Sequence, residues 1–270
     1  MTNPVVSVRR KLISKPVFGA VRKMSALERV WTPTHWGVVF DGGLPRERLD
    51  LVPEYKAQRA PMPEALRSQL PLVERYLDAA GIARIRLEGQ EADDVMASVA
   101  RWAVAEGAGV LLVSNDKDLY QLVSNRIRMI PPAGEETALD GPAVRAKTGV
   151  APERIAEWLA LVGDASDNIE GVPGVGAKTA ARLLNEYGSL RGLREALPAM
   201  PDGKLKQALE TQWPRIERNV RAVRLNTGLE TGWTWNDLER GAGDDEALLR
   251  LFDELEFHRL AQAMREPELL

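Results

Sequence analysis

The chain has no cysteine and only two histidines among its 270 residues. Without cysteine it forms neither disulfides nor thiolate zinc sites, which fits a reducing compartment, and we expect a cytoplasmic protein. No apolar run approaches the roughly 20 residues that span a bilayer, so we expect no membrane association. The sequence also contains no convincing repeat and no low-complexity tract.

The remaining composition is typical of a globular protein, with 44% hydrophobic and 28% charged residues. The net charge of −3 does not by itself indicate nucleic-acid binding, because nucleic-acid-binding domains are usually basic. The charges are segregated, however. Basic residues gather between Arg46 and Arg67 and around Lys178, whereas acids form separate clusters. An acidic pocket that holds metal ions beside basic strips would suit a polyanionic substrate.

The first half of the chain shows an alternation of helix and strand signals. Helical spacing covers 16–30, and a short apolar run over 35–41 indicates a buried strand. After an irregular segment, 42–62, the signals are helices at 63–80, 91–106 and 118–123, and strands near Ile85, at 110–114 and at 127–130. Such alternation predicts an α/β fold, with a mainly parallel central sheet flanked by helices.

Strand signals nearly vanish from about residue 141 onward. The expected helices are 141–148, 152–162, 177–187, 203–211, 214–225 and 246–263. We therefore predict an α/β core over residues 1–145, with an arch near 42–63, and a helical subdomain over 146–270. A long segment such as 42–62 without a steady period is usually functional or mobile.

Acidic residues occur in clusters, each beside a secondary-structure signal. Asp41 ends a strand, and Glu91, Asp93 and Asp94 open a helix. Asp116 and Asp118 follow an apolar strand, and Asp164 and Asp167 precede a glycine-rich hairpin. Each cluster alone reads as helix N-terminal acids or as a turn. Because sites in α/β sheets lie outside the carboxyl ends of the strands, their joint positions favour one shared site.

Carboxylates gathered in one place repel each other and need a counter-charge. With no cysteine and two histidines, that charge is expected to be a hard divalent cation. Two Mg²⁺ or Mn²⁺ ions about 4 Å apart would activate a water and stabilise the leaving oxygen of a phosphodiester. The acids therefore predict a site for phosphoryl transfer.

A glycine-rich turn precedes the helix predicted at 177–187. In GVPGVGAKTAARLL, residues 171–184, Gly171, Gly174 and Gly176 permit close backbone approach, and Lys178 adds a positive charge. This helix-hairpin-helix pattern suits binding of a nucleic-acid backbone without sequence readout; a plain tight turn is the alternative. The spacing of a Walker phosphate loop is absent.

The irregular segment carries a pair of cations, Lys56 and Arg59, in PEYKAQRAPMP. If this stretch is helical, both side chains face the same way and would draw a phosphate toward the metals. A solvated surface loop is the alternative.

With these motifs, the sequence closely resembles the 5′-nuclease (flap endonuclease) family, in the form of the N-terminal 5′→3′ exonuclease domain of bacterial DNA polymerase I. The matching segments are VVFDGG, PEYKAQRAPMPEALRSQLPLV, EADDVMASVA, VSNDKDLYQLV and LVGDASDNIEGVPGVGAKTAARLL. The resemblance implies a PIN-like α/β core with a helical arch, and a potassium-assisted helix-hairpin-helix that holds duplex DNA. It implies metal-dependent cleavage of DNA at 5′ flaps, 5′ ends or single-strand/duplex junctions, in replication or repair.

The resemblance also assigns roles to residues. The metal-site carboxylates of the family match Asp41, Glu91, Asp93, Asp94, Asp116, Asp118, Asp164 and Asp167. Lys56 and Arg59 match the basic pair at the base of the arch, so that with Asp94 they are the expected catalytic residues. Gly171, Gly174, Gly176 and Lys178 match the DNA-binding hairpin. We expect a monomer, and a separate DNA polymerase is a candidate partner because no polymerase domain follows.

The N-terminus departs from the family pattern. The family begins with an apolar strand that ends in Asp-Gly and supplies a metal ligand, but residues 1–15, MTNPVVSVRRKLISK, contain no acid. Either an upstream segment is missing or the ligand is truly lost, and in both cases the sheet is expected to be short of its central strand; some strand at Val5 to Val8 is the alternative. The alternatives to an active DNA nuclease are an impaired relative that only binds junction DNA and a nuclease for structured RNA.

Overall fold

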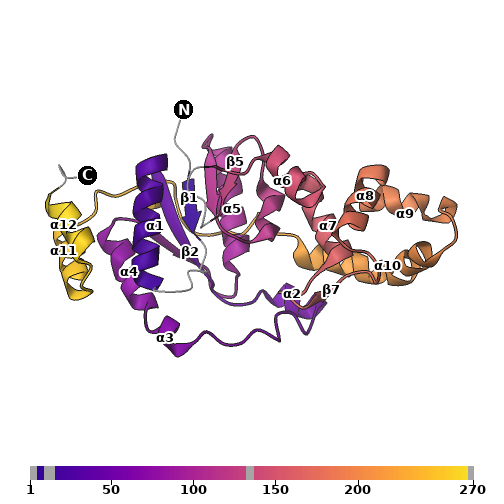
Figure 1. The fold of residues 1–270 in the computed structure, drawn as a ribbon, viewed down its shortest axis with the longest axis horizontal. Coiled ribbons are helices and arrows are strands. Elements are labelled where there is room, and N and C mark those ends of the chain that lie inside the picture. Colours follow the sequence, from indigo (N-terminus) through magenta and orange to yellow (C-terminus); the bar gives the residue numbers. More distant parts are fainter. Residues whose placement is uncertain (1–4, 9–15, 132–136, 267–270) are drawn as a thin grey trace.

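A five-stranded, wholly parallel sheet forms the centre of the molecule (Figure 1). The computed structural model describes residues 5–8, 16–131 and 137–266. The strand order is β3-β2-β1-β4-β5, and the strands are β1 (Val5–Val8), β2 (His35–Phe40), β3 (Ala83–Arg86), β4 (Val110–Val113) and β5 (Ile127–Ile130). The predicted parallel α/β core is therefore confirmed.

The sheet has its central strand after all. Val5 pairs with His35 of β2 on one side and with Val110 of β4 on the other. The expectation that the sheet lacks this strand is wrong, and the alternative, a strand from Val5 to Val8, is confirmed. Residues 9–15, which follow the strand, lie outside the described residues.

Both faces of the sheet are covered by helices, as the apolar strands require. Because side chains alternate along a strand, Trp36, Val38 and Phe40 pack with α1 (Pro16–Trp31) and α4 (Leu70–Ala79). On the opposite face Val39 packs with α5 (Ala92–Ala105). The carboxyl ends of the strands are left open for loops.

The helical half contains α6 (Gly141–Thr148), α7 (Ile155–Val162), α8 (Ala177–Tyr187), α9 (Leu190–Ala196) and α10 (Lys204–Val223). One prediction fails here, because 203–211 and 214–225 are a single helix, α10, that continues through Pro214. Leu209, Trp213 and Ile216 are buried along it, and α10 packs against α7. This continuous apolar stripe outweighs the cost of proline within the helix.

Two other predicted helices are broken. The stretch 63–80 divides into α3 (Glu64–Arg67) and α4. The stretch 246–263 divides into α11 (Asp245–Glu254) and α12 (His258–Arg265), separated where Glu256 has a φ of 56°. A left-handed residue cannot continue a right-handed helix, so the chain turns there into a helical hairpin. The helix expected at 118–123 is a 3₁₀ helix, Lys117–Leu122.

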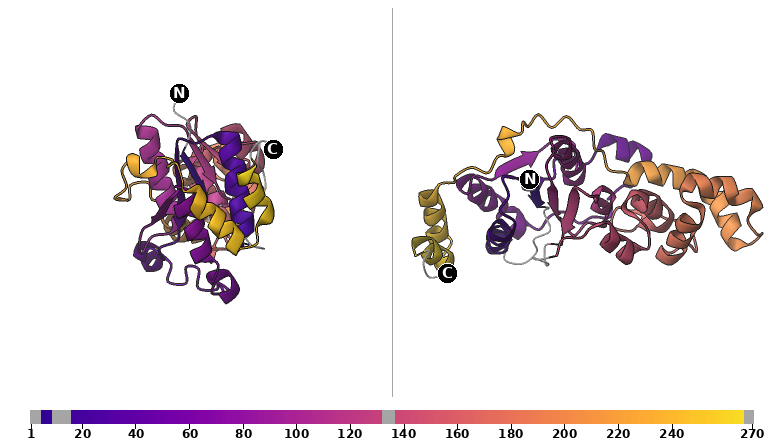
Figure 2. Two further views of the ribbon diagram at one scale, coloured as in Figure 1. Left: turned by 90° about the vertical axis from the view of Figure 1, so that its left-hand side faces the viewer. Right: turned by 90° about the horizontal axis from the view of Figure 1, so that it is seen from above.

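Residues 224–244, which we call the strap, connect α10 to α11 across the core (Figure 2). The amide of Arg240 donates to the carbonyl of Thr34 at 2.8 Å, and the amide of Asp244 to that of Ala79 at 2.6 Å. The strap returns the chain to the α/β core, where α11 packs against α4. Helices α11 and α12 therefore lie at the end of the molecule opposite α8 and α9 (Figure 1). The division of the chain at residue 145 stays a prediction.

No helix in the described part of the chain has the length and apolar character that a membrane span requires.

The packing of α11 gives a first testable prediction. Phe252 is buried beside Tyr76 and Phe257, with ring centroids 6.3 and 6.2 Å away. Phe252→Ala should lower the free energy of unfolding by about 3–5 kcal/mol in urea titrations. Val30→Ala, at a half-exposed position of α1, should change it by less than about 0.5 kcal/mol. Equal effects from both substitutions would show that α11 does not pack on the core.

Candidate metal centre

The predicted acids come together where the α/β core meets the helical half. Asp41, just after β2, accepts a hydrogen bond from the amide of Ala92 at 3.0 Å and so holds the N-terminus of α5. Glu91, the N-cap of α5, is buried, and so are Asp93 and Asp94 in its first turn. Asp116 and Asp118 follow β4 at the same rim of the sheet. The acids of separate segments therefore surround one place, as the strand ends predict.

Asp118, Asp164 and Asp167 form the tightest group. Each offers a carboxylate oxygen within 4.8 Å of the others, and all are buried. Within the part of the chain that the structure describes, Asp118 Oδ1 is buried without a hydrogen-bond partner. Burial raises the pKa of Asp118 well above its ordinary value, and the charges of Asp116, Asp167, Asp164 and Asp93 raise it further. A buried oxygen in so negative a place fits a hard divalent cation.

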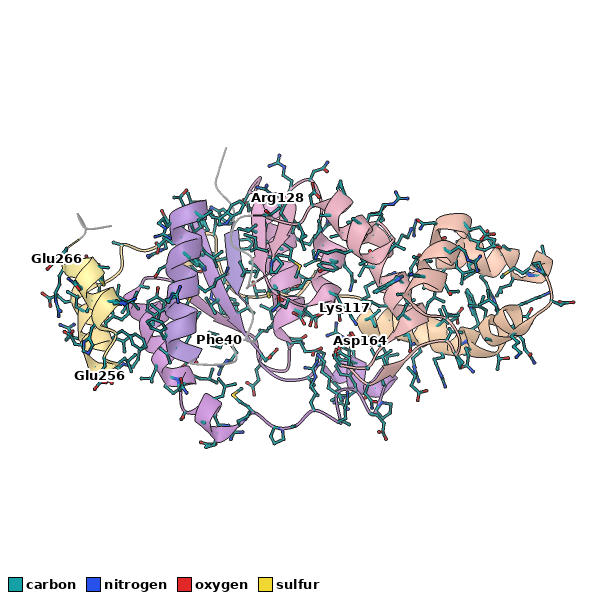
Figure 3. The ribbon with its side chains drawn as sticks, in the orientation of Figure 1. Phe40, Lys117, Arg128, Asp164, Glu256 and Glu266 are labelled. Atoms are coloured by element: carbon teal, nitrogen blue, oxygen red, sulfur yellow. The ribbon has the colours of Figure 1, made fainter. Side chains whose placement is uncertain are left out.

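Two of these acids are held by a small antiparallel hairpin after α7. Its strands are β6 (Gly163–Asp164) and β7 (Ile169–Glu170). Ser166 donates to Asp164 Oδ1 from its amide at 2.9 Å and from its hydroxyl at 2.7 Å. Lys117 Nζ lies 3.2 Å from Asp164 Oδ2, and Figure 3 shows both residues at the junction of the two halves. The hairpin thus brings carboxylates of the helical half to the sheet.

The other end of the cluster is already paired with protein cations. The guanidinium of Arg48, in α2 (Arg46–Leu51), bonds to both Glu91 and Asp94, with Nη2 2.8 Å from Asp94 Oδ1. Lys56 Nζ bonds to Glu91 and lies 3.5 Å from Asp167 Oδ2. Two cations thus face Glu91 and Asp94, so this end is neutral, whereas the group around Asp118 is strongly acidic.

Tyr55 links the two ends. Its hydroxyl lies 3.0 Å from Glu91 Oε2 and 2.9 Å from Asp167 Oδ2. Burial, with the charges of Glu91 and Asp167, raises its pKa far above the ordinary value, so the hydroxyl keeps its proton and donates to a carboxylate. It therefore fixes the spacing between the acidic group and the neutral one.

The basic pair Lys56 and Arg59 reaches the acids from a turn. The segment is irregular, as its lack of a steady period predicts, and the helical alternative is not realised, because Lys56 has a φ of 56° and residues 53–58 form turns. Both side chains still reach Asp167, with Arg59 Nη2 2.6 Å from its Oδ1. The amide of Lys56 also donates to the carbonyl of Asp167 at 3.1 Å. Hydrogen bonds between the turn that carries Lys56 and the loop that carries Asp167, and not a helix, therefore direct both cations at Asp167.

Sequence reasoning missed Arg48. It belongs to the basic stretch that begins at Arg46, but nothing in the local pattern separates it from its exposed neighbours. The available signal was the charge balance, because buried acids on one helix turn need a buried cation close by. Only the fold shows which of the many basic residues is the buried cation that pairs with these acids.

A turn precedes α8 as the glycines predict, and the surroundings of these glycines differ. At Gly171 a Cβ would lie 2.3 Å from the backbone of Val162, so the position demands glycine for packing. Gly176, the N-cap of α8, has open space around it. Gly174, Gly176 and Lys178 are exposed. The N-terminus of α8 is therefore accessible beside a cation, while Gly171 serves the fold.

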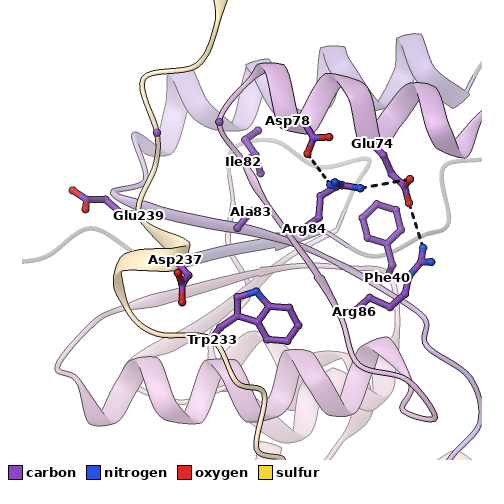
Figure 4. Close-up of a pocket in the computed structure, with 12 residues that line it drawn as sticks. Phe40, Glu74, Asp78, Ile82, Ala83, Arg84, Arg86, Trp233, Asp237 and Glu239 are labelled. Carbon is purple, nitrogen blue, oxygen red and sulfur yellow. Dashed lines mark hydrogen bonds and ion pairs between the residues drawn. The ribbon is translucent and has the colours of Figure 1, made fainter.

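A separate cavity of about 740 Å³ lies at the open edge of β3 (Figure 4). Its two arginines are paired within the protein: Arg84 Nε lies 2.7 Å from Asp78 Oδ1, and Arg86 Nη2 lies 3.4 Å from Glu74 Oε1. None of the predicted metal-site acids lines it. The cavity is therefore separate from the carboxylate cluster.

Comparison with known proteins agrees with this geometry. Residues 5–149 match the family described as "5′-3′ exonuclease, N-terminal resolvase-like domain". Residues 150–246 match "5′-3′ exonuclease, C-terminal SAM fold". The chain therefore belongs to the 5′-3′ exonuclease family.

Similar proteins occur alone and as parts of longer chains. A 5′-3′ exonuclease of Aquifex aeolicus is 33% identical, over 95% of this chain and 87% of its own length. DNA polymerase I of Mycobacterium tuberculosis H37Rv is 37% identical, over 93% of this chain and 28% of its own length. A thermostable DNA polymerase I of Thermus filiformis is 39% identical over 83% of this chain and 26% of its own. The chain thus spans about a quarter of the polymerases that it matches.

Solved structures share the fold. The zinc-bound T5 5′-exonuclease aligns with a TM-score of 0.72 and 22% identity, over 93% of this chain and 98% of the other. The catalytic core of Rad2 in complex with DNA substrate aligns with a TM-score of 0.64 and 16% identity, covering 98% and 92%. At these identities the likeness shows the architecture: an α/β core joined to a helical domain.

The acidic group generates a prediction about stability. Because the folded-state pKa of Asp118 is raised, its carboxyl favours folding below the unfolded pKa of about 3.9, and this benefit is lost as pH rises through the folded pKa. In EDTA near pH 7, Asp118→Asn should therefore raise the free energy of unfolding by on the order of 1 kcal/mol. The gain should vanish near pH 3, where both states are protonated.

Urea titrations at the two pH values measure this effect. Asp50→Asn, at an exposed position of α2, serves as the control and should change stability little at either pH. If Asp118→Asn destabilised the metal-free protein at pH 7, the carboxylates would not repel each other as the structure implies.

Proposed function

We propose that this chain is a structure-selective, metal-dependent 5′ nuclease that hydrolyses DNA phosphodiesters at 5′ ends, flaps or single-strand/duplex junctions in replication or repair. The observation that carries the proposal is the buried group of Asp118, Asp164 and Asp167, whose oxygens lie within 4.8 Å of one another. It occurs in a chain that belongs to the 5′-3′ exonuclease family.

The metal would be Mg²⁺ or Mn²⁺, held by Asp118, Asp164 and Asp167 and surrounded by Asp93 and Asp116. When bound, such ions supply a Lewis acid and lower the pKa of a bound water. The oxygen-only donor set supports a hard cation. Asp118 Oδ1, which is buried and has no hydrogen-bond partner among the described residues, supports a ligand at this place. A second ion at the Asp41, Glu91 and Asp94 end completes the proposed pair.

The cations beside the site would position the scissile phosphate. Of the predicted pair, Arg59 is accessible, with 41% of its side chain exposed, whereas only 5% of the Lys56 side chain is exposed. Arg59 is therefore open to a phosphate oxygen while it contacts Asp167, and Lys56 would reach the substrate only by leaving Glu91. An arginine suits this role, since its guanidinium binds phosphate through paired N–H groups.

The hairpin would bind the duplex part of the substrate. Exposed Gly174, Gly176 and Lys178 at the N-terminus of α8 support backbone contacts to phosphates. Potassium at this hairpin belongs to the same proposal. Such contacts place the protein on DNA without reading its sequence. DNA is thus the proposed partner of a monomeric, cytoplasmic protein, and a DNA polymerase is a candidate second partner, because the family also occurs fused to one.

Cleavage of a labelled 5′-flap duplex with Mg²⁺ and K⁺ tests the proposal. The protein should cleave near the junction, and Asp118→Asn should reduce the rate by at least ~10²-fold while leaving the Kd for the junction within about threefold, because an electrostatic contribution to catalysis is lost. Binding without cleavage at any Mg²⁺ or Mn²⁺ concentration would instead indicate the impaired relative that the acid-free residues 1–15 allow. Preferential cleavage of structured RNA would replace DNA as the substrate.

A pair of glycine substitutions separates fold from binding in the hairpin. Gly171→Ala should lower the free energy of unfolding by about 2–3 kcal/mol, because the new Cβ meets the backbone of Val162. Gly176→Ala has open space and should cost less than ~1 kcal/mol. It should nevertheless weaken duplex binding several-fold, since its Cβ enters the approach to the helix amides. Unchanged binding by Gly176→Ala would place the duplex elsewhere.

A further inference from the structure

Arg48 lies at the neutral end of the carboxylate cluster, where its guanidinium bridges two acidic side chains, Glu91 and Asp94. Its Nη1 bonds to both Glu91 and Asp94, and its Nη2 donates to Asp94 Oδ1 at 2.8 Å. The side chain is only 9% exposed. A single guanidinium therefore takes the place between two carboxylates where a divalent cation would otherwise balance their charge.

The rest of the guanidinium is held by the helical half. Arg48 Nε donates to the carbonyl of Ala222 at 2.8 Å, and Nη2 to that of Arg224 at 3.2 Å. These carbonyls lie at the C-terminal end of α10, which attracts cations. In addition, the amide of Asn226 donates to Asp94 Oδ1 at 2.8 Å. Arg48 thus joins the first turn of α5 to the end of α10 and the start of the strap.

The cation is permanent. Burial opposes its charge, but the hydrogen bond and charge of Asp94 outweigh burial and raise the pKa of Arg48 above its ordinary value. No change of pH in the physiological range removes it. Movement of the Arg48 side chain is therefore needed to free Asp94, and Glu91 also keeps its bond to Lys56 until that side chain moves.

We propose that Arg48 is a built-in counter-cation that competes with a divalent ion for Glu91 and Asp94. The first ion binds the acidic group of Asp118, Asp164 and Asp167, and an ion at the Glu91–Asp94 end binds only when the guanidinium moves aside. This inference rests on the proposed metal-dependent function and adds to it an order of ion binding. It also links the second ion to α10, because movement of Arg48 breaks its contacts with the carbonyls of Ala222 and Arg224.

Titration with Mn²⁺, with free Mn²⁺ followed by electron paramagnetic resonance, tests the inference without any cleavage assay. The natural protein should bind one ion tightly and a second weakly. Arg48→Gln should bind the second ion at least tenfold more tightly, because a positive charge beside its ligands is gone. Adding Glu91→Gln to Arg48→Gln should remove this gain. Arg75→Gln, which breaks an exposed ion pair with Glu254 at the surface, should leave both affinities unchanged.

The possible failures are distinguishable. If the natural protein binds no Mn²⁺, the proposed function fails; if it binds Mn²⁺ and Arg48→Gln binds it identically, only the role of Arg48 is overturned. Should Arg48→Gln not fold, as judged by circular dichroism, Arg48→Lys provides the same test. A lysine keeps the charge but cannot make all these bonds at once, so the second affinity should rise by a smaller factor. An unchanged affinity in Arg48→Lys would overturn the inference.

Discussion

Repulsion between buried carboxylates is the constraint on which the rest of this structure depends. Asp118, Asp164 and Asp167 are brought together from both halves of the chain, with Asp93 and Asp116 close enough to disfavour the charge on Asp118. Such an arrangement lowers stability in the absence of a counter-charge. In the proposed function this negative charge serves to bind divalent cations.

The negative charge of the carboxylates is compensated differently at the two ends of the cluster. At the Glu91–Asp94 end it supplies its own cations, Arg48 and Lys56, and it fixes the spacing with the protonated hydroxyl of Tyr55. At the Asp118 end the partly exposed Lys117 and Arg59 provide less compensation, since solvent screens them. The asymmetry makes the Asp118 end the place where an added cation stabilises the protein most. The connection from α7 to α8 contains both Asp164 and Asp167 and the glycine-rich turn. The same segment therefore aligns the candidate metal centre with the proposed duplex-binding surface.

Much of this arrangement could be predicted from the sequence because it depends on local signals. The strands at 110–114 and 127–130 and the helix at 177–187 lie where apolar periodicity and glycine place them. The convergence of Asp41, Asp94 and Asp116 follows from the rule that parallel strands end at one rim. The unbroken course of α10 through Pro214 was not predictable in this way, because it depends on burial of Trp213 and its neighbours against α7. The role of Arg48 depends likewise on a tertiary contact, here between α2, α5 and the end of α10.

Crystals of the protein soaked in Mn²⁺ and measured at the manganese absorption edge give the most direct test. A buried, acidic group that needs a counter-charge predicts an anomalous peak in contact with Asp118, Asp164 and Asp167. Peaks confined to surface carboxylates, with the buried acids unchanged and empty at saturating Mn²⁺, would contradict a metal centre at this place.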